Sequence, residues 1–168
     1  VLAGAAWFEN FTLSTSTVTV SSAALPEAFS GLRIVQISDL HGRRFDAESR
    51  YLLELVRLQS PDLIALTGDL ADEFTDFSML PPLLEGLTAL APTVYVTGNH
   101  EWVLSREKRA ALFSLLDAAG VVRLQNEYRL LEKGPASIVL AGVDDPNGPY
   151  DQKRPAQLVR EIRQAEGK

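Results

Sequence analysis

The sequence contains no cysteine and only two histidines among its 168 residues. Without cysteine the chain can form no disulfide, and any metal site must use oxygen ligands and histidine nitrogen. Basic residues are also not in excess. The sequence has 16 lysine and arginine residues and 22 acidic residues, which gives a formal net charge of −6. No overall cationic field therefore attracts nucleic acid or an anionic membrane surface, and we expect no nucleic-acid partner.

Long apolar runs are also missing. The first eight residues, VLAGAAWF, are apolar, but a helix that crosses a bilayer needs about 20 such residues. This segment fits the end of an upstream membrane anchor and equally a loosely packed terminus, since no basic flank or cleavage signal decides between them. Two locations stay open: membrane association through an upstream segment, and the cytoplasm. Repeats and linkers are absent, and the length favours a single domain over residues 1–168, which we expect to be a monomer.

Three strand–loop–helix units occupy the first two thirds of the chain. Apolar stretches predict buried strands at residues 32–37, 62–66 and 94–96. The helix after the first strand can be capped by Asp46, and the second helix begins at Pro81 or Pro82. The third runs from about Ser105 to residue 119 and is closed by Gly120. Three such units in series predict an α/β fold.

Three further segments flank these units. Residues 11–20, FTLSTSTVTV, alternate apolar or β-branched residues with hydroxyl residues, which predicts a half-buried edge strand. Residues 128–131 and 137–141, separated by Lys133-Gly134-Pro135, predict a β-hairpin. Residues 155–164 place apolar side chains on one helical face and predict an amphipathic helix.

Polar residues that suit a metal site follow each of the three predicted strands. Asp39 and His41 follow the first, Asp69 the second, and Asn99 and His100 the third. Right-handed crossovers bring the carboxyl ends of parallel strands to one edge of the sheet, so these loops should converge. Two carboxylates in a partly desolvated cleft repel each other, and a divalent cation would remove that cost. The mixed oxygen and nitrogen ligand set suits Mn, Fe, Zn or Co. Two such ions about 3.5–4 Å apart, bridged by one carboxylate, would suit displacement at phosphorus.

The motifs around these residues resemble a known signature. In order and spacing the chain is similar to the calcineurin-like metallophosphoesterases at Asp39-Leu-His41, Gly68-Asp69-Leu-Ala-Asp72 and Gly98-Asn99-His100-Glu101. The stretches FSGLRIVQISDLH and GVDD further resemble a membrane-associated bacterial branch that includes lipid-A-precursor diphosphatases. The resemblance implies a β-sandwich flanked by helices, incomplete here. It also implies hydrolysis of a phosphate monoester, diester or pyrophosphate on a phosphorylated small molecule or a lipid-linked phosphate.

The resemblance also implies a role for each matching residue. Asp39 and His41 would bind a first metal ion, Asp69 would bridge two ions, and Asn99 would bind the second. His100 would contact the substrate together with Asn99, and would stabilise the phosphate charge or protonate the leaving oxygen. An aspartate that matches Asp72 would orient His100. A metal-activated hydroxide would be the nucleophile.

The chain departs from the family pattern in two respects. The family completes its metal site with downstream Gly-His and Gly-x-His motifs, whereas no histidine follows His100 here. We therefore expect a fragment of a longer protein, truncated at its C-terminal end. The alternative is a catalytically silent half-domain that holds metal weakly. Glu73 stands where the protein phosphatases of the family have a phosphate-clamping arginine, so a phosphoprotein substrate is not expected.

Several residues near these motifs have simpler interpretations. Arg43 and Arg44 are expected on a solvated surface. Trp102 either lines the cleft or anchors the helix behind it. Asp144 and Asp145, directly before a proline, are expected to shape a turn.

Overall fold

The computed structural model describes residues 13–46, 48–148 and 152–166. Within these ranges the central sheet has the strand order β1-β2-β3-β4, and all three strand pairs are parallel. The strands are β1 (Ile34–Ile37), β2 (Leu63–Thr67), β3 (Thr93–Val96) and β4 (Val122–Arg123). The first three coincide with the predicted strands to within two residues, which confirms the α/β fold class.

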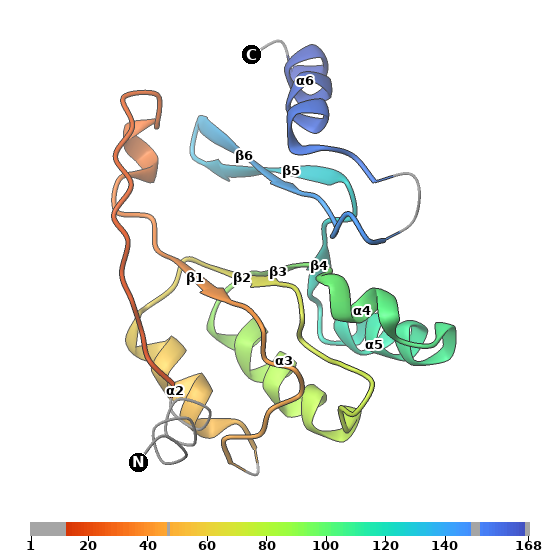
Figure 1. Ribbon diagram of the computed structural model, residues 1–168. Coiled ribbons are helices and arrows are strands. Elements are labelled where there is room, and N and C mark those ends of the chain that lie inside the picture. The colour runs from red at the N-terminus through yellow and green to blue at the C-terminus, as the bar shows by residue number, and fades with distance from the viewer. Residues whose placement is uncertain (1–12, 47, 149–151, 167–168) are drawn as a thin grey trace, which may run out of the picture.

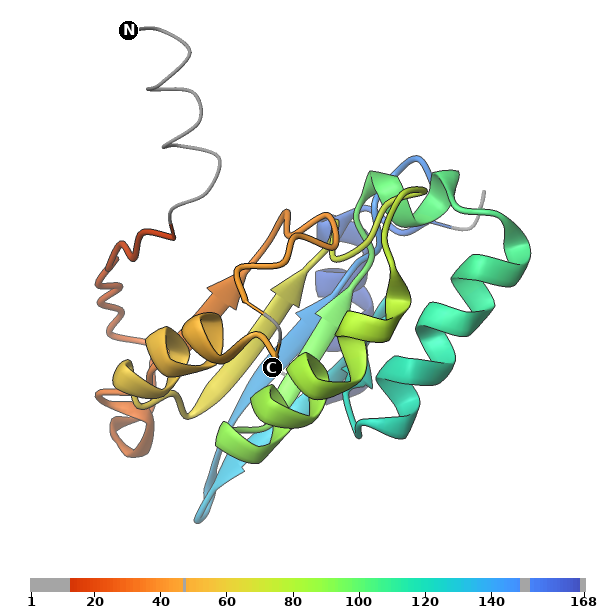
Figure 2. The same cartoon turned by 90° about the horizontal axis from the view of Figure 1, so that it is seen from below.

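Helices cover one face of this sheet. The described helices are η1 (Glu27–Phe29), α2 (Arg50–Leu58), η2 (Phe77–Met79), α3 (Leu80–Leu90), α4 (Asn99–Val103), α5 (Arg106–Ala118) and α6 (Pro155–Glu166). Asp46 caps α2 as predicted, because its carboxylate accepts hydrogen bonds from the backbone N–H groups of Glu48, Arg50 and Tyr51. Ser105 caps α5, and Gly120 follows this helix with a positive φ of 77°. Figure 2 shows α2, α3 and α5 in front of the strands.

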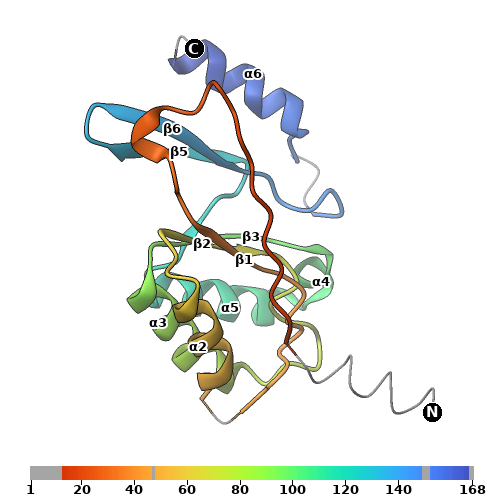
Figure 3. The same cartoon turned by 90° about the vertical axis from the view of Figure 1, so that its left-hand side faces the viewer.

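The predicted hairpin lies on the opposite face of the sheet. Its antiparallel strands are β5 (Glu127–Lys133) and β6 (Ala136–Gly142). Figures 1 and 3 show α2 and α3 on one side of the sheet and the hairpin on the other, with α6 lying beyond the hairpin on the side away from the sheet. The hairpin approaches the sheet closely at Gly142, where an added Cβ atom would lie 2.4 Å from the Cβ atom of Leu124.

The hydrophobic core divides into two clusters, one for each face of the sheet. The larger cluster joins the helices to side chains such as Ile64, Leu66 and Leu84. The smaller cluster, on the hairpin side, consists of buried Leu63, Val94 and Leu124 with partly buried side chains around them. Most of the apolar burial that holds the sheet in place therefore comes from the helix layer.

The edge strand predicted over residues 11–20 is wrong for residues 13–20, which form no strand; residues 11 and 12 lie outside the described ranges. Val18 and Val20 are 83% and 81% exposed. An alternating pattern forms a strand only where a neighbour completes its hydrogen bonds and buries one face. Within the described part of the chain, β1 pairs only with β2 and leaves this segment unpaired.

The apolar stretch at residues 1–8 also lies outside the described residues. None of the helices that the structure describes is long and apolar enough to cross a membrane.

Candidate active site at the carboxyl edge of the sheet

The loops that follow β1 and β2 are joined by backbone hydrogen bonds. The N–H of Asp39 donates to the carbonyl of Gly68 at 3.2 Å, and the N–H of His41 donates to the carbonyl of Asp69 at 2.8 Å. These bonds carry the β1–β2 pairing beyond the ends of the strands. The loop after β3 joins them, because the N–H of His100 donates to Asp69 Oδ1 at 2.9 Å. The three predicted loops therefore converge, and Figure 2 shows them gathered at one end of the sheet.

The backbone at this edge adopts rare conformations. Asp39, His41 and Asp69 have φ angles of 58°, 48° and 52°, in the left-handed region that residues with a Cβ atom seldom occupy. Each such residue costs about 1–3 kcal/mol, and strain of this kind concentrates at functional sites. These turns place the side chains of three predicted metal ligands at the ends of adjacent strands.

Three of the predicted site residues form a compact cluster. His41, Asp69 and His100 each offer one ligand atom, and these atoms all lie within 4.8 Å of one another. The two imidazole rings are 4.5 Å apart and nearly perpendicular, at 84°. Asp69 is buried, with 8% of its surface exposed, whereas Asp39 is exposed and its Oδ1 atom lies 4.0 Å from His41 Nε2. Carboxylate oxygen and imidazole nitrogen atoms at this spacing fit a divalent transition-metal ion.

Asp72 lies beside His41, and Asn99 lies at the start of the helix that follows β3. Asp72 Oδ2 is 3.8 Å from His41 Nδ1, and its Oδ1 atom accepts hydrogen bonds from the Phe74 N–H and the Thr75 hydroxyl. Among the described residues Asp72 makes no hydrogen bond or ion pair with His100, the residue that it was expected to orient. Asn99 is the exposed first residue of α4. His100, which the resemblance placed outside the ligand set, belongs to the cluster.

Glu101 is a site residue to which the sequence assigned no role. Its side chain is completely buried, and its carboxylate accepts hydrogen bonds from four backbone N–H groups. The donors are Asp69 and Gly98 to Oε2, and Leu70 and Ala71 to Oε1. The available signal was local: a glutamate three residues after the N-cap position Gly98 matches the glutamate half of a capping box, in which its carboxylate accepts the N-cap N–H. The bonds to the distant loop had no sequence signal.

Of the two aspartates that were expected to shape a turn, only Asp145 does so. Asp145 shapes the turn, because its carboxylate accepts the N–H of Asn147 at 2.8 Å. Asp144 is buried instead, and its Oδ1 accepts hydrogen bonds from the N–H and the hydroxyl of Thr97 at 3.2 and 2.7 Å. The expectation of a turn residue is therefore wrong for Asp144, which ties the segment after β6 to the end of β3.

Trp102 supports α4 rather than standing free in a cleft. Its indole N–H donates to the Thr97 hydroxyl at 2.9 Å, and the guanidinium of Arg109 lies 4.9 Å from the ring centroid. These contacts support the interpretation of Trp102 as an anchor. Arg44 forms an ion pair with Asp76 at 2.7 Å on the surface, as expected.

Tyr95 lies on β3 close to these acidic groups. Burial raises the pKa of its hydroxyl far above the usual range, and the negative charge of the neighbouring Glu101 raises it further. The hydroxyl is buried and has no described residue in good hydrogen-bond geometry, although the Glu101 carboxylate lies close enough to act on its pKa. Tyr95 therefore stays neutral at physiological pH and does not serve as a base.

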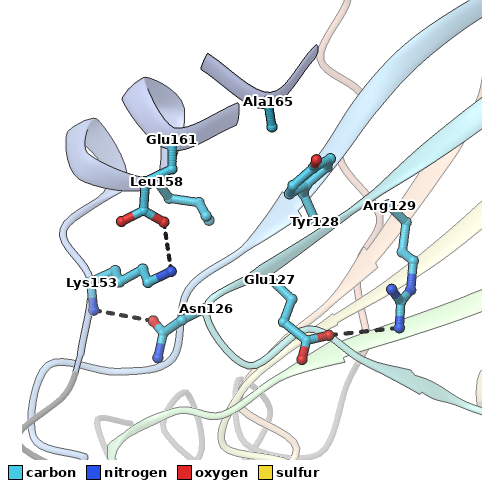
Figure 4. A pocket seen from close by; sticks show the side chains of 8 residues that line it. All are labelled: Asn126, Glu127, Tyr128, Arg129, Lys153, Leu158, Glu161 and Ala165. Atoms are coloured by element: carbon cyan, nitrogen blue, oxygen red, sulfur yellow. Dashed lines mark hydrogen bonds and ion pairs between the residues drawn. The ribbon is translucent and has the colours of Figure 1, made fainter. Parts of the chain in front are cut away.

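A cavity of about 370 Å³ lies between the hairpin and α6 (Figure 4). It is lined by Asn126, Glu127, Tyr128, Arg129, Lys153, Leu158, Glu161 and Ala165. None of these residues belongs to the three converging loops. Its two cationic side chains are already paired, Lys153 with Glu161 at 2.6 Å and Arg129 with Glu127 at 3.6 Å. The chemistry of the candidate site is therefore at the sheet edge and not in this cavity.

Comparison with known proteins agrees with the geometry. The family model of the calcineurin-like phosphoesterases matches residues 32–160. The chain belongs to this family. Members of the family typically bind metal ions, and the matched region contains the whole cluster of His41, Asp69 and His100.

Curated relatives named as phosphoesterases match about two thirds of this chain or more. The metallophosphoesterase YkoQ of Bacillus subtilis is 35% identical over 68% of this chain and 43% of its own length. The phosphodiesterase YaeI of Escherichia coli is 32% identical over 67% of this chain and 43% of its own. A transmembrane protein with a metallophosphoesterase domain from Danio rerio is 31% identical over 72% of this chain and 29% of its own. The chain thus spans less than half the length of these relatives.

Proposed function

We propose that this protein hydrolyses a phosphate monoester, diester or pyrophosphate at a dinuclear metal centre built on the converging loops. The observation that supports this most directly is the cluster of His41, Asp69 and His100, held by strained backbone in a chain of the calcineurin-like family. The relative YaeI is named as a phosphodiesterase, which favours a diester as the first substrate to test.

The metal ligands would be Asp39, His41, Asp69 and Asn99, with Asp69 shared between two cations of Mn, Fe, Zn or Co. When bound, such cations polarise phosphoryl oxygens and make a water nucleophilic near neutral pH. Asp72 lies on the Nδ1 side of His41, which leaves Nε2 to face Asp39 and a cation. We therefore propose that Asp72 acts on His41, in place of the role toward His100 that the resemblance implied.

His100 would act on the substrate. Its backbone N–H is bonded to Asp69 Oδ1, so its position is tied to the carboxylate that would bridge the ions. Its imidazole could then stabilise the charge on the phosphoryl group, with Asn99 beside it, and donate a proton to the leaving oxygen.

We extend the proposal to a membrane-associated protein that acts on a phosphorylated small molecule or a lipid-linked phosphate. The Danio rerio relative is named as a transmembrane protein, which supports the membrane association. A monomer remains our proposal for the assembly.

The test compares the wild-type chain with Asp69→Asn, using bis-p-nitrophenyl phosphate with added Mn²⁺. Loss of even an outer partner of a metal ligand costs about 10–100-fold in affinity or activity, so we expect a rate lower by about 100-fold or more. Asp117→Asn is the matched control, because it makes the same change at an exposed carboxylate on α5 that is paired with Arg123. Equal rates in wild type and Asp69→Asn would contradict the proposal.

A second function, a catalytically silent half-domain, is favoured by one observation. Both histidines of this sequence already lie in the cluster of His41, Asp69 and His100, so the sequence offers no further imidazole for a second cation. Mn²⁺ binding that depends on Asp69, without hydrolysis of any phosphoester supplied, would support this alternative.

A further inference from the structure

Glu101 is a fully buried carboxylate for which the described part of the chain supplies no ion pair. Its exposed surface is 0%, and four backbone N–H groups take the place of a cation. The donor distances are 2.9 Å from Asp69, 2.8 Å from Gly98, 2.8 Å from Leu70 and 3.2 Å from Ala71. A buried carboxylate is tolerated only where such hydrogen bonds compensate its lost hydration. The arrangement is therefore specific for a charged, doubly accepting side chain.

These bonds join two loops that are far apart in the sequence. The bond to Gly98 is local and closes the first turn of α4. The other three reach 30 to 32 residues back, to the loop after β2. Asp69 is held at two points. Its backbone N–H donates a hydrogen bond to the Glu101 carboxylate, and its Oδ1 atom accepts a hydrogen bond from the N–H of His100.

The two loops also approach each other too closely to shift freely. A Cβ atom added at Gly98 would lie 2.3 Å from Asp69 Oδ1 and 2.6 Å from the Asp69 backbone nitrogen. Glycine at this position lets the carboxylate of Asp69 lie directly against the loop after β3. The position of Asp69 thus depends on the contact between the loops, and Glu101 holds that contact together.

We propose that Glu101 is a positioning residue that sets Asp69 against His41 and His100 by clamping the loops after β2 and β3 to each other. The inference rests on the proposed metal-dependent function. Glu101 is enclosed by these loops, so it acts through Asp69 and touches neither substrate nor cation.

The first test is Glu101→Gln, which keeps the size of the side chain but replaces one accepting oxygen by an NH₂ group. In either orientation of the amide, one pair of backbone N–H groups then faces a donor. We expect the Mn²⁺ dissociation constant, measured by EPR titration of free Mn²⁺, to rise by about tenfold or more. We also expect faster amide exchange by NMR at residues 69, 70, 71 and 98.

Asp144→Asn is the matched control. Asp144 is also a buried carboxylate that accepts a backbone N–H, but its partner is Thr97 and not the loop after β2. We expect its dissociation constant to stay within about threefold of wild type. An equal loss of affinity in both variants, or wild-type affinity in Glu101→Gln, would overturn the proposal.

Glu101→Asp serves if Glu101→Gln does not fold. It keeps the charge and the local bond to Gly98 but is one methylene shorter, so we expect the bonds to residues 69–71 to be lost and Mn²⁺ affinity to fall by about tenfold. Wild-type affinity in this variant would refute the clamp.

Failure of the proposed function is recognised separately. Wild type and Asp69→Asn would then bind Mn²⁺ equally, while the exchange rates at residues 69–71 still report on Glu101. Rapid exchange of these amides in the wild-type chain would refute the clamp itself.

Discussion

The two faces of the parallel sheet are covered to very different extents. On the helix side, Ile64, Leu84 and Leu87 are completely buried. On the hairpin side, Leu63, Val94 and Leu124 are buried, but Ile34 at the β1 edge is 51% exposed. Figures 1 and 3 show the hairpin as a separate layer above the strands.

This difference indicates where the rigidity of the candidate site originates. Parallel strands are normally buried on both faces, and here the helix face provides most of that burial. The loops at the carboxyl edge are fixed by this face and by the buried carboxylate of Glu101. The polar link from Asp144 to Thr97 ties the segment that follows the hairpin to the end of β3.

The largest expected effect comes from the same substitution made on the two faces. Leu84→Ala removes a fully buried side chain from α3 and should lower the free energy of unfolding by about 2–5 kcal/mol. Leu140→Ala, on the hairpin side where the side chain is only partly buried, should lower it by about 1 kcal/mol. Urea unfolding of both variants measures the contrast. Equal losses would show that the two faces contribute alike.

A smaller effect is expected at the start of α2, which belongs to the helix layer. The backbone N–H of Tyr51 lowers the pKa of Asp46 below its ordinary value of 3.8. Because this pKa is depressed in the folded state, the stabilisation is present above about pH 4 and is lost as pH falls through the folded pKa. Asp46→Ala should therefore lower the Tm at pH 7, and the gap to wild type should close near pH 2.

Asp46→Asn separates charge from hydrogen bonding in that experiment. It keeps one accepting oxygen but does not titrate, so its own contribution to α2 should not change between pH 7 and pH 2. A gap between Asp46→Ala and wild type that stays constant at low pH would show that the ionised cap contributes nothing.

The smallest effect is expected from a polar atom inside the better packed face. The Tyr95 hydroxyl is buried with no residue of the described ranges in good hydrogen-bond geometry, and Tyr95→Phe removes it. We expect the free energy of unfolding to stay constant or to rise by about 1 kcal/mol. Tyr51→Phe on α2, where the side chain is half exposed, is the control. A clear loss of stability in Tyr95→Phe alone would show that the hydroxyl has a bonding partner.

Much of the fold could be predicted because its signals are local. The helix expected over residues 155–164 is α6 (Pro155–Glu166), and the hairpin expected around Gly134 is formed by β5 and β6. Apolar periodicity, proline at a helix start and glycine after a helix end all act within a few residues. The strand expected over residues 11–20 depended on a pairing partner, which local periodicity does not provide.

The candidate site was predictable in composition but not in its internal contacts. Asp39, His41, Asp69 and His100 could be selected because each follows a predicted strand, and parallel topology brings strand ends together. The contact of Asp72 with His41 could not, since it depends on the positive φ angles at His41 and Asp69. The three hydrogen bonds from the loop after β2 to Glu101 were hidden as well, because they join residues 30 to 32 positions apart, whereas the bond from Gly98 had a local signal.

By itself, the order of residues in this chain determined an α/β fold, the ends of most helices and strands, and a set of acidic and imidazole side chains at one sheet edge. Only the tertiary structure decided which of those side chains touch, which face of the sheet carries the larger core, and that Glu101 joins two loops. The physical reason is the distance along the sequence over which each interaction acts. Periodicity and capping act over one or two turns of backbone, whereas the contacts of a buried carboxylate depend on the packing of segments 30 residues apart.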